Sequence, residues 1–170
     1  MEYLYCGGTF HFDYQNENYR TEASQDYRAI ILGGLDGLLK NDGVVKLSER
    51  ASYVGPFYFE SDGMVDRTIV STEKAQVEAC TTAIFLLEDA RCPGTVGEMI
   101  YAATLGKKIR IFYVRDDRET ESTLHAPCWY PMILSDQIDP DNVEMVPCCD
   151  YAEAKQRAIA YICEVVFPAY

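Results

Sequence analysis

Residues 83–114, AIFLLEDARCPGTVGEMIYAATLGKKIRIFYV, decide the fold class of this chain. Ala83–Leu87 is apolar throughout and is followed by two acidic residues, the pattern of a strand that is buried on both faces. A helical pattern follows at about 96–105 and stops at Gly106, and Ile109–Val114 is a second buried-strand pattern. Strand, helix and strand at this spacing predict parallel neighbours in one sheet.

The same alternation of strand and helix patterns continues on both sides of this stretch. Apolar runs predict further strands at residues 3–6, 44–47, 53–59 and 143–146. Apolar residues at helical spacing predict further helices at residues 24–39, about 65–80 and 150–166. The sequence therefore predicts an α/β fold of one domain, residues 1–170. Its form is a doubly wound three-layer sandwich with a mainly parallel, about five-stranded central sheet of the flavodoxin or Rossmann-like type.

The size and charge of the chain limit the kind of protein it can be. Its 170 residues are enough to bury one hydrophobic core. With 27 acidic and 15 basic residues the net charge is −12, which repels the phosphate backbone of DNA and RNA. A small nucleotide is not excluded, because a local pocket can differ in sign from the whole surface. The sequence has no recognisable signal peptide or membrane-spanning apolar stretch, so a cytoplasmic protein is expected.

The seven cysteines do not form a metal-binding or disulfide pattern. Their number is odd, there is no CxxC pair and only two histidines accompany them, so neither a metal nor another cofactor is predicted. Reduced thiols are the expected state in the cytoplasm. Cys92 precedes a helix start, where a thiolate is favoured, but neither histidine has a sequence context that marks it as the base of a cysteine enzyme.

Small and polar residues follow the predicted strands where a ligand pocket is expected. In a parallel sheet, ligands bind beyond the carboxyl ends of the strands. Three such ends carry suitable residues: the Gly7-Gly8-Thr9-Phe10 turn, the Glu88-Asp89 pair and the 92–95 loop before a helix. Asp13 and Tyr14 follow the glycine turn and are further candidates for lining the pocket.

The turn and helix start at residues 92–98 have two interpretations. Pro93-Gly94 makes a tight turn, and the first N–H groups of the helix would face the cleft, a natural place for an oxygen of a ligand. Thr95 and Glu98 also have the spacing of a capping box, in which both side chains would only satisfy N–H groups of the helix. In the other interpretation Glu98 borders the pocket, and the helix start keeps its carboxylate ionised at neutral pH.

The stretch from Ala83 to Val114 resembles the nucleoside 2-deoxyribosyltransferase family. In that family a hydrophobic strand ends in acidic residues, and a glycine-containing turn leads into a helix with the motif Glu-x-x-Tyr-Ala. Gly-Lys and another strand then follow. This chain supplies Ile84-Phe85-Leu86-Leu87-Glu88-Asp89, Gly94-Thr95, Glu98-Met99-Ile100-Tyr101-Ala102, Gly106-Lys107 and Ile109–Val114. The opening, Tyr3 to Phe10, is also similar to that of the family.

The resemblance implies roles for several residues. Glu98 would be the nucleophile that attacks the anomeric carbon, expels the base and forms a glycosyl-enzyme ester, which a second base or water resolves. Glu73 is the nearest match to the carboxylate that holds the sugar or the nucleophile, the alternative being a solvated or capping residue. Glu88 or Asp89 would assist the departing base. Cys92 replaces an acidic residue that the family often has, which leaves the base specificity open.

The resemblance also implies a homo-oligomer with shared sites. Family members can close the site of a neighbouring subunit with a carboxy-terminal aromatic residue, for which Tyr170 is the candidate. His125 and Trp129 lie in a loop where a partner subunit could contribute. The aromatic-rich segment 54–60 is a candidate wall for a nucleobase, or else a sheet-edge or dimer contact.

Two other functions fit the same residues. A nucleotide N-glycosidase would hydrolyse a nucleoside 5′-monophosphate, with Thr95 and Arg91 as the groups near its phosphate. A non-catalytic nucleotide sensor would bind its ligand without turnover. The expected partners are a small nucleoside or nucleotide and a free nucleobase, with no nucleic acid and no membrane.

Overall fold

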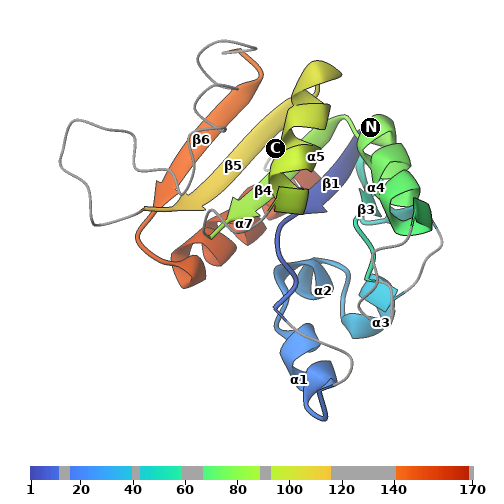
Figure 1. The fold of residues 1–170 in the computed structure, drawn as a ribbon, viewed down its shortest axis with the longest axis vertical. Coiled ribbons are helices and arrows are strands. Elements are labelled where there is room, and N and C mark those ends of the chain that lie inside the picture. The colour runs from blue at the N-terminus through green and yellow to red at the C-terminus, as the bar shows by residue number, and fades with distance from the viewer. Residues whose placement is uncertain (12–15, 40–42, 59–66, 89–92, 116–140, 169–170) are drawn as a thin grey trace.

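The fold is built on a six-stranded sheet in the order β2-β3-β1-β4-β5-β6, in a computed structural model that describes residues 1–11, 16–39, 43–58, 67–88, 93–115 and 141–168 (Figure 1). The strands are β1 (Glu2–Gly7), β2 (Val45–Lys46), β3 (Ala51–Gly55), β4 (Thr82–Leu87), β5 (Lys108–Val114) and β6 (Val143–Cys148). All neighbours pair in parallel except β2, which is antiparallel to β3. The predicted mainly parallel sheet is confirmed, with a short sixth strand at its edge.

Helices cover both faces of this sheet and so form three layers (Figure 1). The helices are α1 (Tyr19–Ser24), α2 (Tyr27–Ile31), α3 (Leu35–Leu39), α4 (Arg67–Ala79), α5 (Pro93–Thr104) and α7 (Tyr151–Val166). α4 and α5 pack on one face, and α2 and α7 pack on the other. Alternate residues of a strand point to opposite faces, so Tyr5 belongs to the first core and its neighbours Leu4 and Cys6 to the second.

The unit of β4, α5 and β5 forms as the sequence predicts. All six residues of β4 are buried, which explains why its sequence is apolar without alternation. β4 lies between β1 and β5, and its Ile84 is in register with Cys6 on one side and Arg110 on the other. α5 leaves the carboxyl end of β4 and returns the chain to β5.

The order of the strands reverses beside β1. From β1 the chain reaches β3 on one side, then crosses to β4 on the other side and continues outward to β6. In open α/β sheets, ligands bind in the crevice at such a reversal, outside the carboxyl ends of the strands. The turn after β1 and the start of α5 after β4 border this crevice together.

The single helix predicted at residues 24–39 is wrong, because the chain forms α2 and α3 there, after α1. Gly33 and Gly34 have positive φ values of 76° and 136°, and they separate α2 from α3. The cap of α2 is Asp26, whose carboxylate accepts from the N–H of Arg28 at 2.9 Å, and not Ser24. The predicted stop at residues 41–43 lies partly outside the described residues.

Two further boundaries differ from the prediction. β3 ends at Gly55 and does not extend to residue 59. α5 begins at Pro93, three residues earlier than the pattern suggested, because proline suits the first position of a helix. The last helix begins after Asp150, as predicted, where the Asp150 carboxylate accepts from the N–H of Glu153 at 2.8 Å. Among the described helices, none combines the length and the apolar character that crossing a bilayer requires.

Candidate active site

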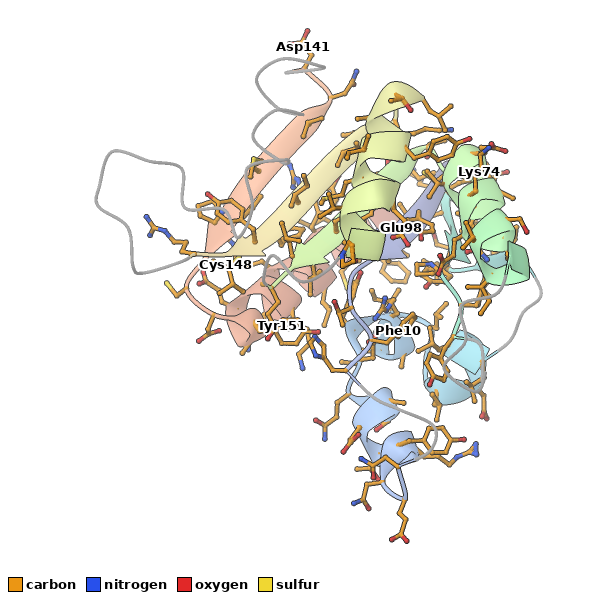
Figure 2. The ribbon with its side chains drawn as sticks, in the orientation of Figure 1. Phe10, Lys74, Glu98, Asp141, Cys148 and Tyr151 are labelled. Atoms are coloured by element: carbon orange, nitrogen blue, oxygen red, sulfur yellow. The ribbon has the colours of Figure 1, made fainter. Side chains whose placement is uncertain are left out.

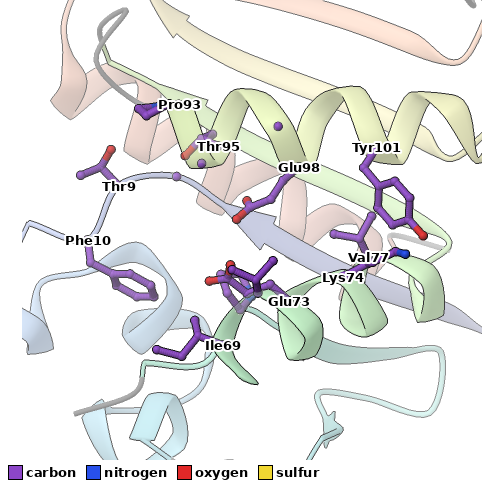
Figure 3. A pocket seen from close by; sticks show the side chains of 15 residues that line it. Thr9, Phe10, Ile69, Glu73, Lys74, Val77, Pro93, Thr95, Glu98 and Tyr101 are labelled. Carbon is purple, nitrogen blue, oxygen red and sulfur yellow. The ribbon is translucent and has the colours of Figure 1, made fainter. Parts of the chain in front are cut away.

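A pocket of about 620 Å³ opens at the reversal of the sheet, between α4, α5 and the turn after β1 (Figure 3). This volume suits a small molecule. The pocket is lined by Gly8, Thr9, Phe10, Pro56, Ile69, Val70, Glu73, Lys74, Val77, Pro93, Gly94, Thr95, Gly97, Glu98 and Tyr101. Glu98 lies near its middle, with the start of α5 toward one end and Lys74 and Tyr101 toward the other. Its walls are mostly apolar, with the two glutamates facing each other across it.

Glu98 reaches from α5 toward the end of β1, where it meets Gly7 (Figure 2). A Cβ atom on Gly7 would lie 3.0 Å from Glu98 Oε2 and 2.5 Å from two carbons of the Phe85 ring. The Phe85 ring would have to move to admit this Cβ atom, and the contact with the carboxylate is tighter than most packed side chains make. Glycine at this position therefore lets the carboxylate rest against the strand end.

Glu73 and Glu98 form a carboxyl pair across the pocket, one from α4 and one from α5 (Figure 3). Burial, and after it the nearby Glu73, raise the pKa of Glu98, while Tyr5 and Arg28 lower it, and the net result is a pKa of about 8. Burial also raises the pKa of Glu73, against the attraction of Arg28. Near neutral pH the pair therefore retains a proton, mainly on Glu98.

This proton corrects the expectation that the helix start keeps Glu98 ionised. Because α5 begins at Pro93, Glu98 is its sixth residue, beyond the first turn where the helix dipole acts. The same boundary removes the capping box, since Thr95 is the third helical residue and not the cap. Glu98 instead points into the pocket (Figure 3).

Tyr5 is a site residue that the sequence did not reveal. It is fully buried in β1 beside Glu98, and its hydroxyl lowers the pKa of that carboxyl through a hydrogen bond. As the side chains stand, the Tyr5 hydroxyl meets no partner with good hydrogen-bond geometry within the described residues. The contact between this hydroxyl and the Glu98 carboxyl is therefore longer or less well aligned than a good hydrogen bond.

The far end of the pocket joins α4 to α5. The Tyr101 hydroxyl donates to Glu78, and Lys74 lies 4.0 Å from the same carboxylate and 5.3 Å from the centre of the Tyr101 ring. Lys74 carries the one positive charge among the described residues that line the pocket. Within the described residues, no three His, Cys, Asp or Glu side chains lie close enough together to bind a metal ion.

Most of the predicted site residues come together here. Those that line the pocket are Gly8, Thr9, Phe10, Glu73, Gly94, Thr95 and Glu98, and Gly7 lies directly against Glu98. Several lie outside the described residues: Asp13, Tyr14, Asp89, Arg91, Cys92, His125, Trp129 and Tyr170. Among the lining residues that the prediction did not name are Ile69, Val70, Lys74 and Val77 of α4.

Glu88 does not line this pocket. Its carboxylate lies 3.0 Å from His11 Nε2, and the His11 ring packs edge-on against Tyr151 of α7 at 4.7 Å. The Glu88 side chain is therefore turned toward the α7 side in this structure.

The aromatic segment after β3 has a divided role. Phe57 is buried in the core against Tyr53, and Tyr58 packs edge-on against Phe10 at 5.2 Å. Pro56 lines the pocket. The segment thus supports the wall that Phe10 forms, and its Phe57 ring is unavailable to a ligand.

Comparisons with known proteins find a structure of similar fold without assigning a family. No protein-family profile matches the sequence, and no curated protein is similar to it. The structure is similar to that of the CMP N-glycosidase BcmB of Clostridium botulinum, with a TM-score of 0.52 and 14% sequence identity. The alignment covers 94% of this chain and 99% of that one. At this identity the likeness establishes a shared fold.

Proposed function

We propose that this chain cleaves the N-glycosidic bond of a nucleoside or a nucleoside 5′-monophosphate, with Glu98 as the nucleophile. The observation that carries the proposal is the Glu98 carboxyl, which faces the pocket from α5 against Gly7 and opposite Glu73. A carboxylate suits this reaction because it traps an oxocarbenium-like centre and can leave again. The fold likeness to a CMP N-glycosidase supports the same reaction class.

The carboxyl pair supplies both groups that the reaction needs. When the shared proton is on Glu73, the ionised Glu98 attacks C1′ and the C1′–N bond breaks, its electron pair leaving with the base. The base takes the proton from Glu73. In the second step water attacks C1′, gives a proton to Glu73 and releases Glu98 from the ester. Asp89, outside the described residues, stays a predicted assistant for the departing base.

Base exchange is the second candidate function. A free nucleobase would replace water in the second step, so that the products are a new nucleoside and the original base. The Glu98-x-x-Tyr101-Ala102 motif and its surrounding sequence favour this function through their resemblance to the 2-deoxyribosyltransferases. Which acceptor is used depends on whether a base or water occupies the pocket beside the ester.

The test is a substrate panel followed by chromatography. The panel contains 2′-deoxynucleosides and nucleoside 5′-monophosphates, each with and without a second free base. Free base released without an acceptor indicates hydrolysis, and a new nucleoside formed only with the acceptor indicates exchange. Acid-quenched protein should gain the mass of the sugar moiety when the ester accumulates.

Two variants show whether any turnover in the substrate panel depends on Glu98. Glu98→Gln keeps the size of the side chain and removes the nucleophile, so we expect a loss of turnover of at least about 10³-fold and no sugar adduct. Glu164→Gln, on the exposed side of α7, is the matched control and should behave as the wild type. Tight binding without product from any substrate would contradict the proposal and identify a nucleotide sensor. The predicted homo-oligomer is tested separately by sedimentation equilibrium.

A further inference from the structure

Three consecutive backbone carbonyls at the carboxyl end of β1 and in the turn after it are held by two neighbouring side chains of α2. The Tyr27 hydroxyl donates to the oxygen of Gly7 at 2.8 Å. Arg28 donates from Nη1 to the oxygen of Gly8 at 2.9 Å and from Nη2 to the oxygen of Thr9 at 3.2 Å. These three hydrogen bonds thus hold the turn that borders the pocket from the side of the sheet that carries α2.

Arg28 is prepared for this contact by Asp26. Both side chains are buried, and the guanidinium donates from Nε and Nη2 to the two carboxylate oxygens at 2.8 and 2.7 Å. Burial alone would lower the pKa of Arg28, but Asp26 outweighs this effect and raises it, so the guanidinium stays charged. The rigid fork leaves its outer N–H groups aimed at the turn.

The same guanidinium also sets the aromatic wall of the pocket. Its central carbon lies 3.5 Å from the centre of the Phe10 ring, a stacked cation–π contact. Tyr58 packs edge-on against the same ring at 5.2 Å. Phe10, which lines the pocket, is therefore held from two directions.

Arg28 acts on the carboxyl pair through its charge as well. It lowers the pKa of both Glu98 and Glu73, although it lines neither wall of the pocket. The other groups that influence Glu98 are Glu73 from α4 and Tyr5 from β1, and Lys74 lies farther along the same pocket. Removing the guanidinium should therefore favour the protonated, non-nucleophilic form of Glu98.

We propose that Tyr27 and Arg28 form a clamp that positions the Gly7–Phe10 turn against Glu98 and Glu73 and so sets the reactivity of the site. Both are positioning residues, since neither reaches the pocket. A purely structural role explains the buried ion pair of Asp26 and Arg28 less well. A buried ion pair is often no more stabilising than apolar side chains of equal volume, whereas only a forked cation can hold two successive carbonyls and an aromatic ring together. The kinetic consequences rest on the proposed function, but the positioning itself does not.

Three variants separate the parts of the clamp. Arg28→Lys keeps the charge and loses the fork, and Tyr27→Phe loses only the bond to the Gly7 carbonyl. Asp26→Asn/Arg28→Met removes both charges together, so that no unpaired carboxylate is left buried. Arg157→Met is the matched control. Arg157 also pairs with a carboxylate and donates to a backbone carbonyl, that of Pro147 at 2.9 Å, but it does so on the exposed side of α7.

The first measurement is a ¹³C NMR titration of the glutamate carboxyls, with Glu98 assigned from Glu98→Gln, together with amide exchange of the turn. In the double variant we expect the Glu98 midpoint to rise by about half a unit or more. In Arg28→Lys the midpoint should stay, while the amides of residues 8–10 exchange about tenfold faster. With a substrate, Arg28→Lys should raise KM about tenfold and leave the pH profile in place. Arg157→Met should change none of these.

A folded double variant with the wild-type Glu98 midpoint, or a folded Arg28→Lys with wild-type exchange at the turn, would overturn the clamp. If the double variant does not fold, Arg28→Lys and Tyr27→Phe decide the question by exchange. If the wild type turns over no substrate, the proposed function fails, and the titration and exchange still give their own answer.

Discussion

At the scale of single residues, Glu98 must lose a proton before it can attack, and its surroundings oppose that loss. Because the proposed reaction needs one proton, on Glu73, beside an ionised Glu98, kcat/KM should fall as the pH rises through about 8, where the pair loses that proton. Glu73→Gln removes the negative charge that raises the pKa of Glu98, and Glu98 must then be ionised by itself. The profile of this variant should therefore rise with pH, through a midpoint about one unit lower. The maximal rate should fall nonetheless, by about 10²-fold, because the proton donor is lost. The pH profile of kcat/KM checks both effects.

The direction of this shift distinguishes Glu73 from a solvated bystander. A midpoint that stays near that of the wild type, with an unchanged maximal rate, would mean that Glu73 lies beside the reaction without taking part in it. Glu164→Gln again serves as the control, since its carboxylate is exposed on α7 and should leave the profile in place.

Tyr5→Phe should shift the same profile the other way. The Tyr5 hydroxyl lowers the pKa of Glu98, so its removal raises the midpoint of kcat/KM to higher pH, by roughly half a unit. The ring stays in the core, where it packs against Phe85 at 6.1 Å, so the fold should be retained. We expect kcat at the optimum to fall about tenfold. A midpoint that moves to lower pH, or a Tm lowered by many degrees, would argue against this role.

At the scale of elements, the carboxyl end of β1 and the middle of α5 approach too closely for any side chain on Gly7. Gly7→Ala places a Cβ atom 2.5 Å from the Phe85 ring and 3.0 Å from Glu98 Oε2. The overpacking should cost about 1–3 kcal/mol of the free energy of unfolding. Displacement of Glu98 by even 1 Å should lower kcat/KM about 10²-fold. Urea denaturation and initial rates measure the two effects.

Gly97→Ala on α5 is the comparison for stability. No atom lies within 4 Å of a Cβ built at Gly97, and alanine is the better helix former by roughly 0.5–1 kcal/mol. We therefore expect this variant to be as stable as the wild type or more so. Equal destabilisation of both variants would show that the close contact at Gly7 is not the cause.

The elements that the sequence predicted best are those whose burial is uniform. β4 is buried along its whole length and its apolar run is unambiguous, and in β5 the run from Ile109 to Val114 is interrupted only by Arg110. The region of residues 24–39 was mispredicted because apolar spacing across two short helices imitates one longer helix. Gly33 and Gly34 mark the break between the two helices, and two consecutive glycines inside a helical pattern are the signal in the sequence for such a break.

The candidate site was predictable only in part, because a local motif is visible in the sequence and a contact between distant residues is not. Glu98, Thr95 and the glycine turn lie in local motifs that the chain order makes visible. Tyr5 looks like an ordinary core residue of a strand, and nothing local shows that its hydroxyl faces Glu98. Arg28 likewise finds its partners about twenty residues away, through contacts that form only once α2 packs under the turn.

At the scale of the whole molecule, the reversal of strand order beside β1 assembles groups from three separate segments. Tyr5 and the glycine turn come from β1, Glu73 from α4 and Glu98 from α5, and the pocket brings these elements together. The result is a pair of carboxyls kept partly out of water, where burial opposes the ionisation of both and Glu73 makes that of Glu98 harder still. Such an arrangement favours chemistry at the expense of folding stability.

That conflict gives a prediction for the stability of the entire chain. Glu98 has a pKa of about 8 when folded, against an ordinary value of 4.5. Because the folded value is raised, the protonated group contributes stability that is complete below pH 4.5 and is lost as the pH rises to about 8. Glu98→Gln cannot ionise, so its free energy of unfolding should exceed that of the wild type by less than about 1 kcal/mol at pH 5. At pH 9 it should exceed the wild-type value by about 5 kcal/mol. Urea denaturation at both pH values, with Glu164→Gln alongside, measures this difference. A constant offset across pH would instead indicate that Glu98 ionises freely in the folded chain.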